Sequence, residues 1–128
     1  METAPINWKI ELILLPVSDV DRAKSFYVDQ VGFHPDYDQV VSEDLRFVQL
    51  TPPGSACSIA IGKGLIDKQP GSVGGLLMVV PDVQAAHRHL VERGVAVTDV
   101  HDEPWGRFVE FSDPDGNRWS LQQLPSRN

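Results

Sequence analysis

Near its start the chain reads Pro16-Val17-Ser18-Asp19-Val20-Asp21-Arg22-Ala23, and 63 residues later it reads Val79-Val80-Pro81-Asp82-Val83-Gln84-Ala85-Ala86. Later parts of the two halves agree as well: Phe47–Pro53 lies over Phe108–Pro114, and Cys57–Ile59 lies over Trp119–Leu121. Self-similarity of this kind indicates a structural unit that is repeated along the chain. We therefore interpret the sequence as a tandem duplication joined near Gly71 to Gly75.

The first copy predicts a strand, a helix and three further strands. The apolar run 10–17 is too short for a helix and predicts a strand that is covered on both faces. Ser18 or Asp19 can cap a helix that Gly32 ends, because a glycine accepts the left-handed conformation of a helix C-terminus. Strands are then expected over 33–39, 45–51 and 56–62. The unit is βαβββ.

The second copy predicts the same order of elements. A strand is expected over 76–80, a helix over 82–93 that Gly94 ends, and strands over 95–100, 108–112 and 117–123. Asp113-Pro114-Asp115-Gly116 is a strong turn signal between the last two strands. The repeats then run over 8–62 and 75–124, with a linker over 63–74.

The length of the chain indicates that both units share one core. Units of about 60 residues would be marginally stable alone, so we expect one domain over 1–128. The predicted fold class is α+β. Two tandem βαβββ units form a cupped, incomplete eight-stranded barrel with the helices outside, and function is expected inside the cup.

Composition limits the possible partners and compartments. The net charge of -7 argues against nucleic-acid binding, which needs a basic patch, and it permits cationic ligands. The one cysteine agrees with a reducing compartment. The sequence has neither an apolar run of about 20 residues nor a basic and apolar N-terminal leader, so no membrane span or signal peptide is expected. The predicted location is cytoplasmic.

The duplicated pattern resembles a known superfamily. The stretch Asp19–Tyr27, the pair Gly32-Phe33 and the final Asp113–Asn117 are similar to motifs of the vicinal oxygen chelate superfamily, which includes glyoxalase I, extradiol dioxygenases and bleomycin resistance proteins. The resemblance covers nearly the whole chain and implies the cupped fold. It does not by itself imply an activity, because function resides in the site and not in the scaffold.

The resemblance also implies where a metal would lie. Metal-dependent members hold an ion with His or Glu at four inward strand positions, which correspond here to Leu12, Ser58, Gly75 and Ser120. None of the four has an imidazole or a carboxylate, which divalent metals require. We therefore expect no cofactor. If the strand register were shifted by one residue, Glu11 would supply a carboxylate at only one of the four positions.

Catalytic candidates are few. His87 and His89 are two residues apart on a helix, so they do not point at one ion. His101 precedes two carboxylates, Asp102 and Glu103, which could raise its basicity for proton transfer. Glu11 and His101 are the two candidates for a catalytic role.

The segment around Trp105 resembles the one by which bleomycin resistance proteins present a tryptophan to a cationic, planar antibiotic. A loop tryptophan can stack on such a ligand, although it can also simply cover the end of a sheet. On the expected strand alternation, the ligand-binding residues are Leu12, Leu14, Ser58, Gly75, Leu77, Trp105, Ser120 and Gln122.

Three functions remain open from the sequence. The first is a metal-free small-molecule binding protein of the glyoxalase/bleomycin resistance type that sequesters a cationic or planar antibiotic-like ligand. The second is an isomerase, lyase or dioxygenase-type enzyme of the same superfamily that acts on a small carbonyl compound at a noncanonical site. The third is an accessory or interaction role. Because relatives are often dimers, the resemblance also implies a homodimer.

Overall fold

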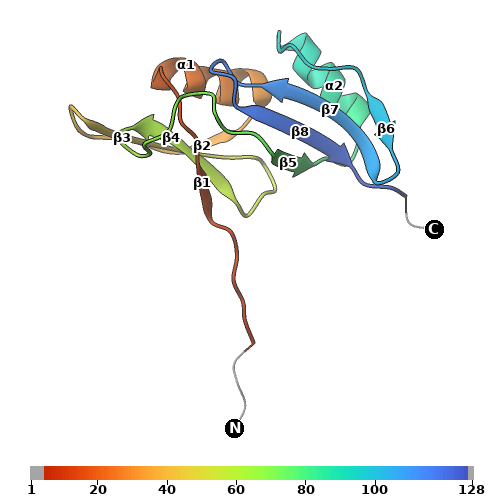
Figure 1. The fold of residues 1–128 in the computed structure, drawn as a ribbon, viewed down its shortest axis with the longest axis horizontal. Helices are drawn as coiled ribbons and strands as arrows, with labels where there is room; N and C mark the ends of the chain where they lie inside the picture. Colours follow the sequence, from red (N-terminus) through yellow and green to blue (C-terminus); the bar gives the residue numbers. More distant parts are fainter. Residues whose placement is uncertain (1–4, 127–128) are drawn as a thin grey trace.

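The computed structural model describes residues 5–126, which form two four-stranded sheets with helices packed on them (Figure 1). The first unit comprises β1 (Leu12–Leu14), α1 (Val20–Ser25), the π-helical η1 (Phe26–Val31), β2 (His34–Ser42), β3 (Leu45–Thr51) and β4 (Ser58–Lys63). The second comprises β5 (Leu76–Val79), α2 (Val83–Glu92), β6 (His101–Glu103), β7 (Gly106–Ser112) and β8 (Arg118–Gln123). The expected duplicated βαβββ order and α+β class are confirmed.

Both sheets have the same strand order. It is β1-β4-β3-β2 in the first and β5-β8-β7-β6 in the second. Strand β1 is parallel to β4, and β5 is parallel to β8, whereas the other neighbouring strands are antiparallel. The sheets do not close into a barrel. In each sheet, the strand that precedes the helix is an edge strand.

Both helices begin at the aspartates that the repeat aligns. The side chain of Asp19 accepts a hydrogen bond from the backbone N–H of Arg22, and that of Asp82 accepts bonds from Gln84 and Ala85. Gly32 ends the first helical segment with φ of 106°, a conformation that favours glycine. The helix ends are therefore encoded locally, as predicted.

One core joins the two halves. Tyr27 of η1 is fully buried and contacts Trp119 of β8, with 6.1 Å between the ring centroids. The Tyr27 hydroxyl donates to Asp113, which lies between β7 and β8, and Trp119 Nε1 donates to the same hydroxyl. A shared core is thus confirmed, and its centre is a polar network between the two units.

Two strand predictions are wrong. Segment 95–100 forms a single bridge, Val97 with Phe111, and the strand begins only at His101. The pairing between this segment and β7 shifts by one residue after Thr98, so a bulge at Asp99 and Val100 interrupts the ladder. The run 10–17 yields only the three-residue β1, and this strand is not covered on both faces, because Ile13 is exposed.

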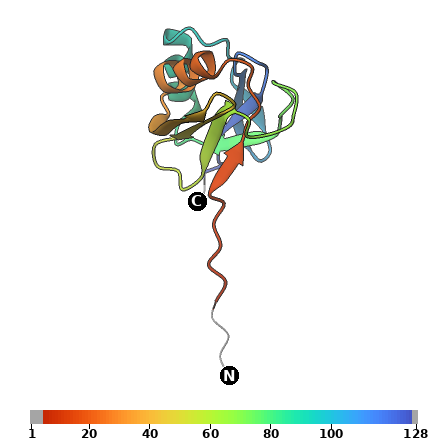
Figure 2. The same ribbon diagram turned by 90° about the vertical axis from the view of Figure 1, so that its left-hand side faces the viewer.

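The chain before β1 is extended and leaves the body of the molecule (Figures 1 and 2). Within residues 5–126, no helix has the length and apolar character needed to cross a membrane.

Candidate ligand-binding site

The second sheet has one face in the core and one open face. Leu77, Ser120 and Glu110 are paired across β5, β8 and β7, so their side chains share a face. The neighbouring row of Leu76, Trp119 and Phe111 points the other way and is buried in the core. The open face is therefore the one that carries Glu110.

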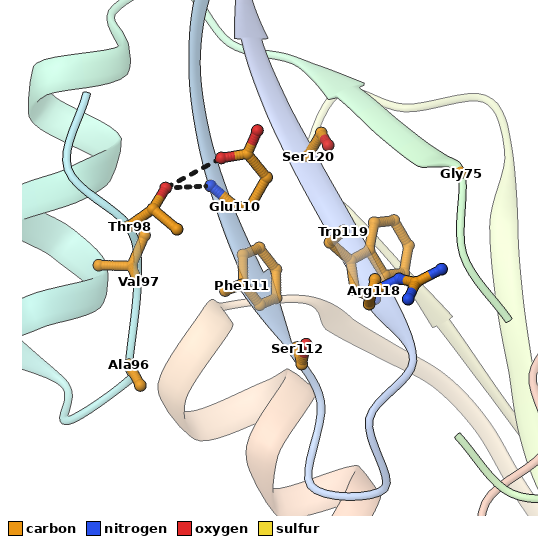
Figure 3. A pocket seen from close by; sticks show the side chains of 10 residues that line it. All are labelled: Gly75, Ala96, Val97, Thr98, Glu110, Phe111, Ser112, Arg118, Trp119 and Ser120. Atoms are coloured by element: carbon orange, nitrogen blue, oxygen red, sulfur yellow. Dashed lines mark hydrogen bonds between the residues drawn. The ribbon is translucent and has the colours of Figure 1, made fainter. Parts of the chain in front are cut away.

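A cavity of about 590 Å³ lies at this face near the start of β8 (Figure 3). Its polar side chains come from two strands and one connecting segment: Glu110 and Ser112 on β7, Arg118 and Ser120 on β8, and Thr98 in the segment before β6. The backbone at Gly75 forms the edge toward β5. The size and the few convergent polar groups are typical of a small-molecule site.

Glu110 is a charged residue of this cavity whose carboxylate is fixed by hydrogen bonds. Thr98 Oγ1 donates to Glu110 Oε2 at 2.9 Å, and the Glu110 backbone N–H donates to Thr98 Oγ1 at the same distance. His101 Nε2 lies 2.8 Å from each carboxylate oxygen. Sequence reasoning missed Glu110, although a carboxylate on the polar side of an alternating strand was the available signal.

The closest partner of His101 is Glu110, which was not predicted, and of the two predicted carboxylates Glu103 also lies within ion-pair distance. Glu110 occupies its Nε2, Glu103 lies 3.8 Å from its Nδ1, and Asp102 instead accepts from Arg107. The bulge before His101 turns its ring toward β7, where it also stacks on Phe108. Glu110 thus fixes the orientation of the His101 ring through Nε2, while Nδ1, the other ring nitrogen, faces Glu103.

The structure does not bring the two catalytic candidates together. Glu11 is exposed and precedes β1 in the first sheet, whereas His101 lies on β6 at the outer edge of the second sheet (Figure 1).

Arg118 gives the cavity a positive charge. The guanidinium of this exposed side chain packs against the backbone at Gly74, where a Cβ atom would lie 2.6 Å from Arg118 Nη2. The cavity thus offers one cation, Arg118, and one carboxylate, Glu110, of which the carboxylate is held by hydrogen bonds.

Trp105 lies in the turn between β6 and β7 at the edge of the open face. Its side chain is exposed, and its carbonyl oxygen accepts a 2.9 Å bond from Gln122 Nε2. The next residue, Gly106, has φ of 152°, and a Cβ there would lie 2.6 Å from the Gln123 carbonyl oxygen. A glycine is therefore required at this turn, which carries Trp105 at the end of the sheet.

The predicted ligand-binding residues fall on two sheets. Gly75 and Ser120 line the cavity, and Leu77, Gln122 and Trp105 belong to the same sheet or its rim. The other three, Leu12, Leu14 and Ser58, lie on β1 and β4 of the first sheet.

Around Ser58 the first sheet has a polar chain of its own. Ser58 and Thr51 hydroxyl oxygens are 2.6 Å apart, Thr51 donates to Asp36, and Gln49 donates to Ser58.

The residues present do not fit the metal of the superfamily. Leu12 is paired with Ser58, while Ser120 is paired with Leu77 and not with Gly75, which precedes β5. The pairing therefore corrects the repeat-based superposition by two residues, and none of the positions concerned has an imidazole or a carboxylate. Across residues 5–126, no three His, Cys, Asp or Glu side chains are grouped so that they could hold an ion.

The fold and this site define the class of protein. The model of the Glyoxalase/Bleomycin resistance protein/Dioxygenase superfamily matches residues 9–121, and the chain belongs to this superfamily.

Solved structures of high similarity come from the same group. TnmS3, an antibiotic binding protein from Streptomyces sp. CB03234, is 40% identical with a TM-score of 0.86, and the match covers 95% of this chain and all of TnmS3. A glyoxalase/bleomycin resistance protein from the same organism is 43% identical with a TM-score of 0.80, over 90% of this chain and all of that one. Among curated proteins, the uncharacterized YetH of Bacillus subtilis (strain 168) is 23% identical, over 90% of this chain and 98% of YetH.

Proposed function

We propose that this chain is a metal-free binding protein that sequesters a cationic or planar antibiotic-like small molecule in the cytoplasm. The observation that carries the proposal is the cavity on the open face of the second sheet, which has a held carboxylate at Glu110. The exposed Trp105 lies in the turn beside the other end of β8, on the edge of the same sheet. A carboxylate attracts a ligand cation, and an exposed indole offers a face for stacking. The 40% identity to TnmS3, an antibiotic binding protein, supports the same function.

Doxorubicin, a planar antibiotic with an ammonium group, is a suitable probe together with bleomycin. We expect isothermal titration to show binding of at least one of them to the wild-type protein. Trp105→Ala should weaken that binding about 2- to 30-fold, because an aromatic or cation–π contact contributes about 0.5 to 2 kcal/mol.

Tyr37→Ala is the matched control, since Tyr37 is also an exposed aromatic residue but lies on β2 of the first sheet. An unchanged dissociation constant for Trp105→Ala would remove this residue from the site. If the wild-type protein binds neither compound, the sequestering role is wrong for this class of ligand.

The proposal also requires that binding needs no metal. Protein purified without chelators should contain far less than one Zn, Ni, Fe or Mn per chain by elemental analysis, because Leu12, Ser58, Gly75 and Ser120 have no imidazole or carboxylate. Treatment with EDTA should leave the titration unchanged. One tightly held ion per chain, or binding lost on chelation, would contradict the metal-free mechanism.

We further propose that the functional unit is a homodimer. Each sheet ends in an unpaired edge strand, β1 or β5, and exposed unpaired edges are places where a second chain can add.

A further inference from the structure

Glu110 and Arg118 are neighbours of opposite charge that do not pair with each other. Glu110 lies opposite Ser120, and Arg118 lies opposite Ser112, so the two charged residues are diagonal neighbours on one face of β7 and β8. The Cα atoms of such neighbours are about 7 to 8 Å apart, which long side chains can bridge. Among the ion pairs of residues 5–126, however, Arg118 takes part in none. Its guanidinium is therefore left for another partner.

The two charged groups point away from one another. Thr98 and His101 bond the carboxylate of Glu110 on the side of β6. The guanidinium of Arg118 instead packs on the backbone at Gly74, on the side of β5. Figure 3 shows the carboxylate beside Thr98 and the guanidinium directed toward the chain that leads into β5. The cavity thus holds a negative and a positive group at separate places instead of an ion pair.

The surroundings of Arg118 are those of an anion subsite. The hydroxyl groups of Ser112 and Ser120 line the same cavity, one opposite Arg118 and one two residues further along β8. Among the residues drawn in Figure 3, hydrogen bonds join Thr98 and Glu110 but neither serine hydroxyl, so both hydroxyls can donate to a ligand. A guanidinium binds a carboxylate through two parallel N–H bonds, and hydroxyl donors beside it can add to them.

We propose that the cavity takes an amphoteric ligand, a planar small molecule with a cationic amine at one end and a carboxylate at the other. The amine lies at Glu110 and the carboxylate at Arg118. The inference rests on the proposed binding function and narrows its ligand class from cations to zwitterions. Because the net charge of the chain is -7, its overall field favours cations over zwitterions, so a preference for a zwitterion must come from a local positive group.

Ciprofloxacin and its methyl ester are a matched pair of probes. Ciprofloxacin is planar and near neutral pH carries an ammonium and a carboxylate at opposite ends, whereas the ester keeps the ammonium and lacks the carboxylate charge. By isothermal titration, we expect the wild-type protein to bind ciprofloxacin about 3- to 10-fold more tightly than the ester, because a charge-assisted pair in a partly open site contributes modestly.

Arg118→Gln should abolish this preference, because it weakens binding of ciprofloxacin and leaves binding of the ester unchanged. Arg88→Gln is the matched control and should keep the preference, since Arg88 is also exposed but lies on α2, outside the cavity. Arg118→Lys should keep part of the preference, because lysine offers the charge without the planar fork. Glu110→Gln should weaken binding of both probes alike, since both carry the ammonium.

Gly74→Ala tests the position of the guanidinium without changing the charge. The φ angle of Gly74 is not positive, so alanine fits its backbone. Its Cβ would lie 2.6 Å from Arg118 Nη2 and would displace that flexible side chain. We expect Gly74→Ala to reduce the preference for ciprofloxacin and to cause no further loss when combined with Arg118→Gln. Additive losses in the double variant would contradict an effect through Arg118.

The outcomes separate this inference from the proposed function. Equal binding of the two probes, tighter binding of the ester, or a preference that survives in Arg118→Gln overturns the amphoteric ligand, while binding of the ester still supports sequestration of cations. Binding of doxorubicin without binding of ciprofloxacin has the same meaning. If the wild-type protein binds none of doxorubicin, bleomycin, ciprofloxacin and the ester, both ideas are wrong. Circular dichroism melts establish that each variant is folded.

Discussion

Asp113→Ala is expected to lower the free energy of unfolding by about 3 to 5 kcal/mol, because it leaves several buried donors without an acceptor. Asp113 is only 5% exposed. Its Oδ1 accepts from the backbone N–H groups of Asp115, Gly116 and Asn117, at 2.9 to 3.0 Å. Its Oδ2 accepts from the Tyr27 hydroxyl and from Asn117 Nδ2, each at 2.8 Å.

Urea unfolding measures this effect. Asp113→Asn keeps one acceptor oxygen for the backbone donors and should lie between the wild type and Asp113→Ala. Asp99→Ala removes an exposed carboxylate on the same half of the chain and should change stability by less than about 0.5 kcal/mol. If Asp113→Ala stays within about 1 kcal/mol of the wild type, the network does not hold the two units together.

The second large effect is a loss of stability at high pH that depends on Tyr27. Burial, and next to it the carboxylate of Asp113, raise the pKa of Tyr27 far above its ordinary value of 10.0. The folded protein therefore keeps this proton at a pH where the unfolded chain releases it. The contribution is fully present below pH 10 and decreases above it by about 1.4 kcal/mol per pH unit.

Tyr27→Phe should remove this part of the pH dependence. It should also cost about 1 to 3 kcal/mol near neutral pH, because Trp119 Nε1 loses its acceptor and Asp113 loses a donor. Tyr37→Phe changes the other tyrosine, which is exposed, and should keep the alkaline slope of the wild type. The measurement is the free energy of unfolding by urea between pH 8 and 11; parallel curves for wild type and Tyr27→Phe would contradict the prediction.

Predictions from the sequence succeeded where neighbouring residues encode the structure. The capping aspartates Asp19 and Asp82 and the terminating Gly32 lie where expected, because caps depend on residues a few positions apart. The failed strand over 95–100 has the right composition, but a bulge at Asp99 and Val100 depends on the register of β7.

The candidate site was predictable only in part. Alternation along β8 places Ser120 and Gln122 on one face, as expected. The pairing of Ser120 with Leu77 depends on the register between β5 and β8, whereas the sequence repeat alone would place Gly75 at the position of Leu77. Glu110 and His101 are nine residues apart and face each other only because β6 folds back on β7.

The sequence by itself determined the duplicated βαβββ order, and its motifs already indicated the superfamily, because these depend on residue types and local spacing. It also showed that the four positions expected to hold a metal carry neither His nor Glu. Only the tertiary structure decided which groups meet. Tyr27 bonds Asp113 across 86 residues, Glu110 rather than Asp102 holds His101, and residues 5–11 extend away from the body of the molecule with Ile6, Trp8 and Ile10 exposed. Such contacts are set by strand register and by packing between the halves, which no local pattern in the chain specifies.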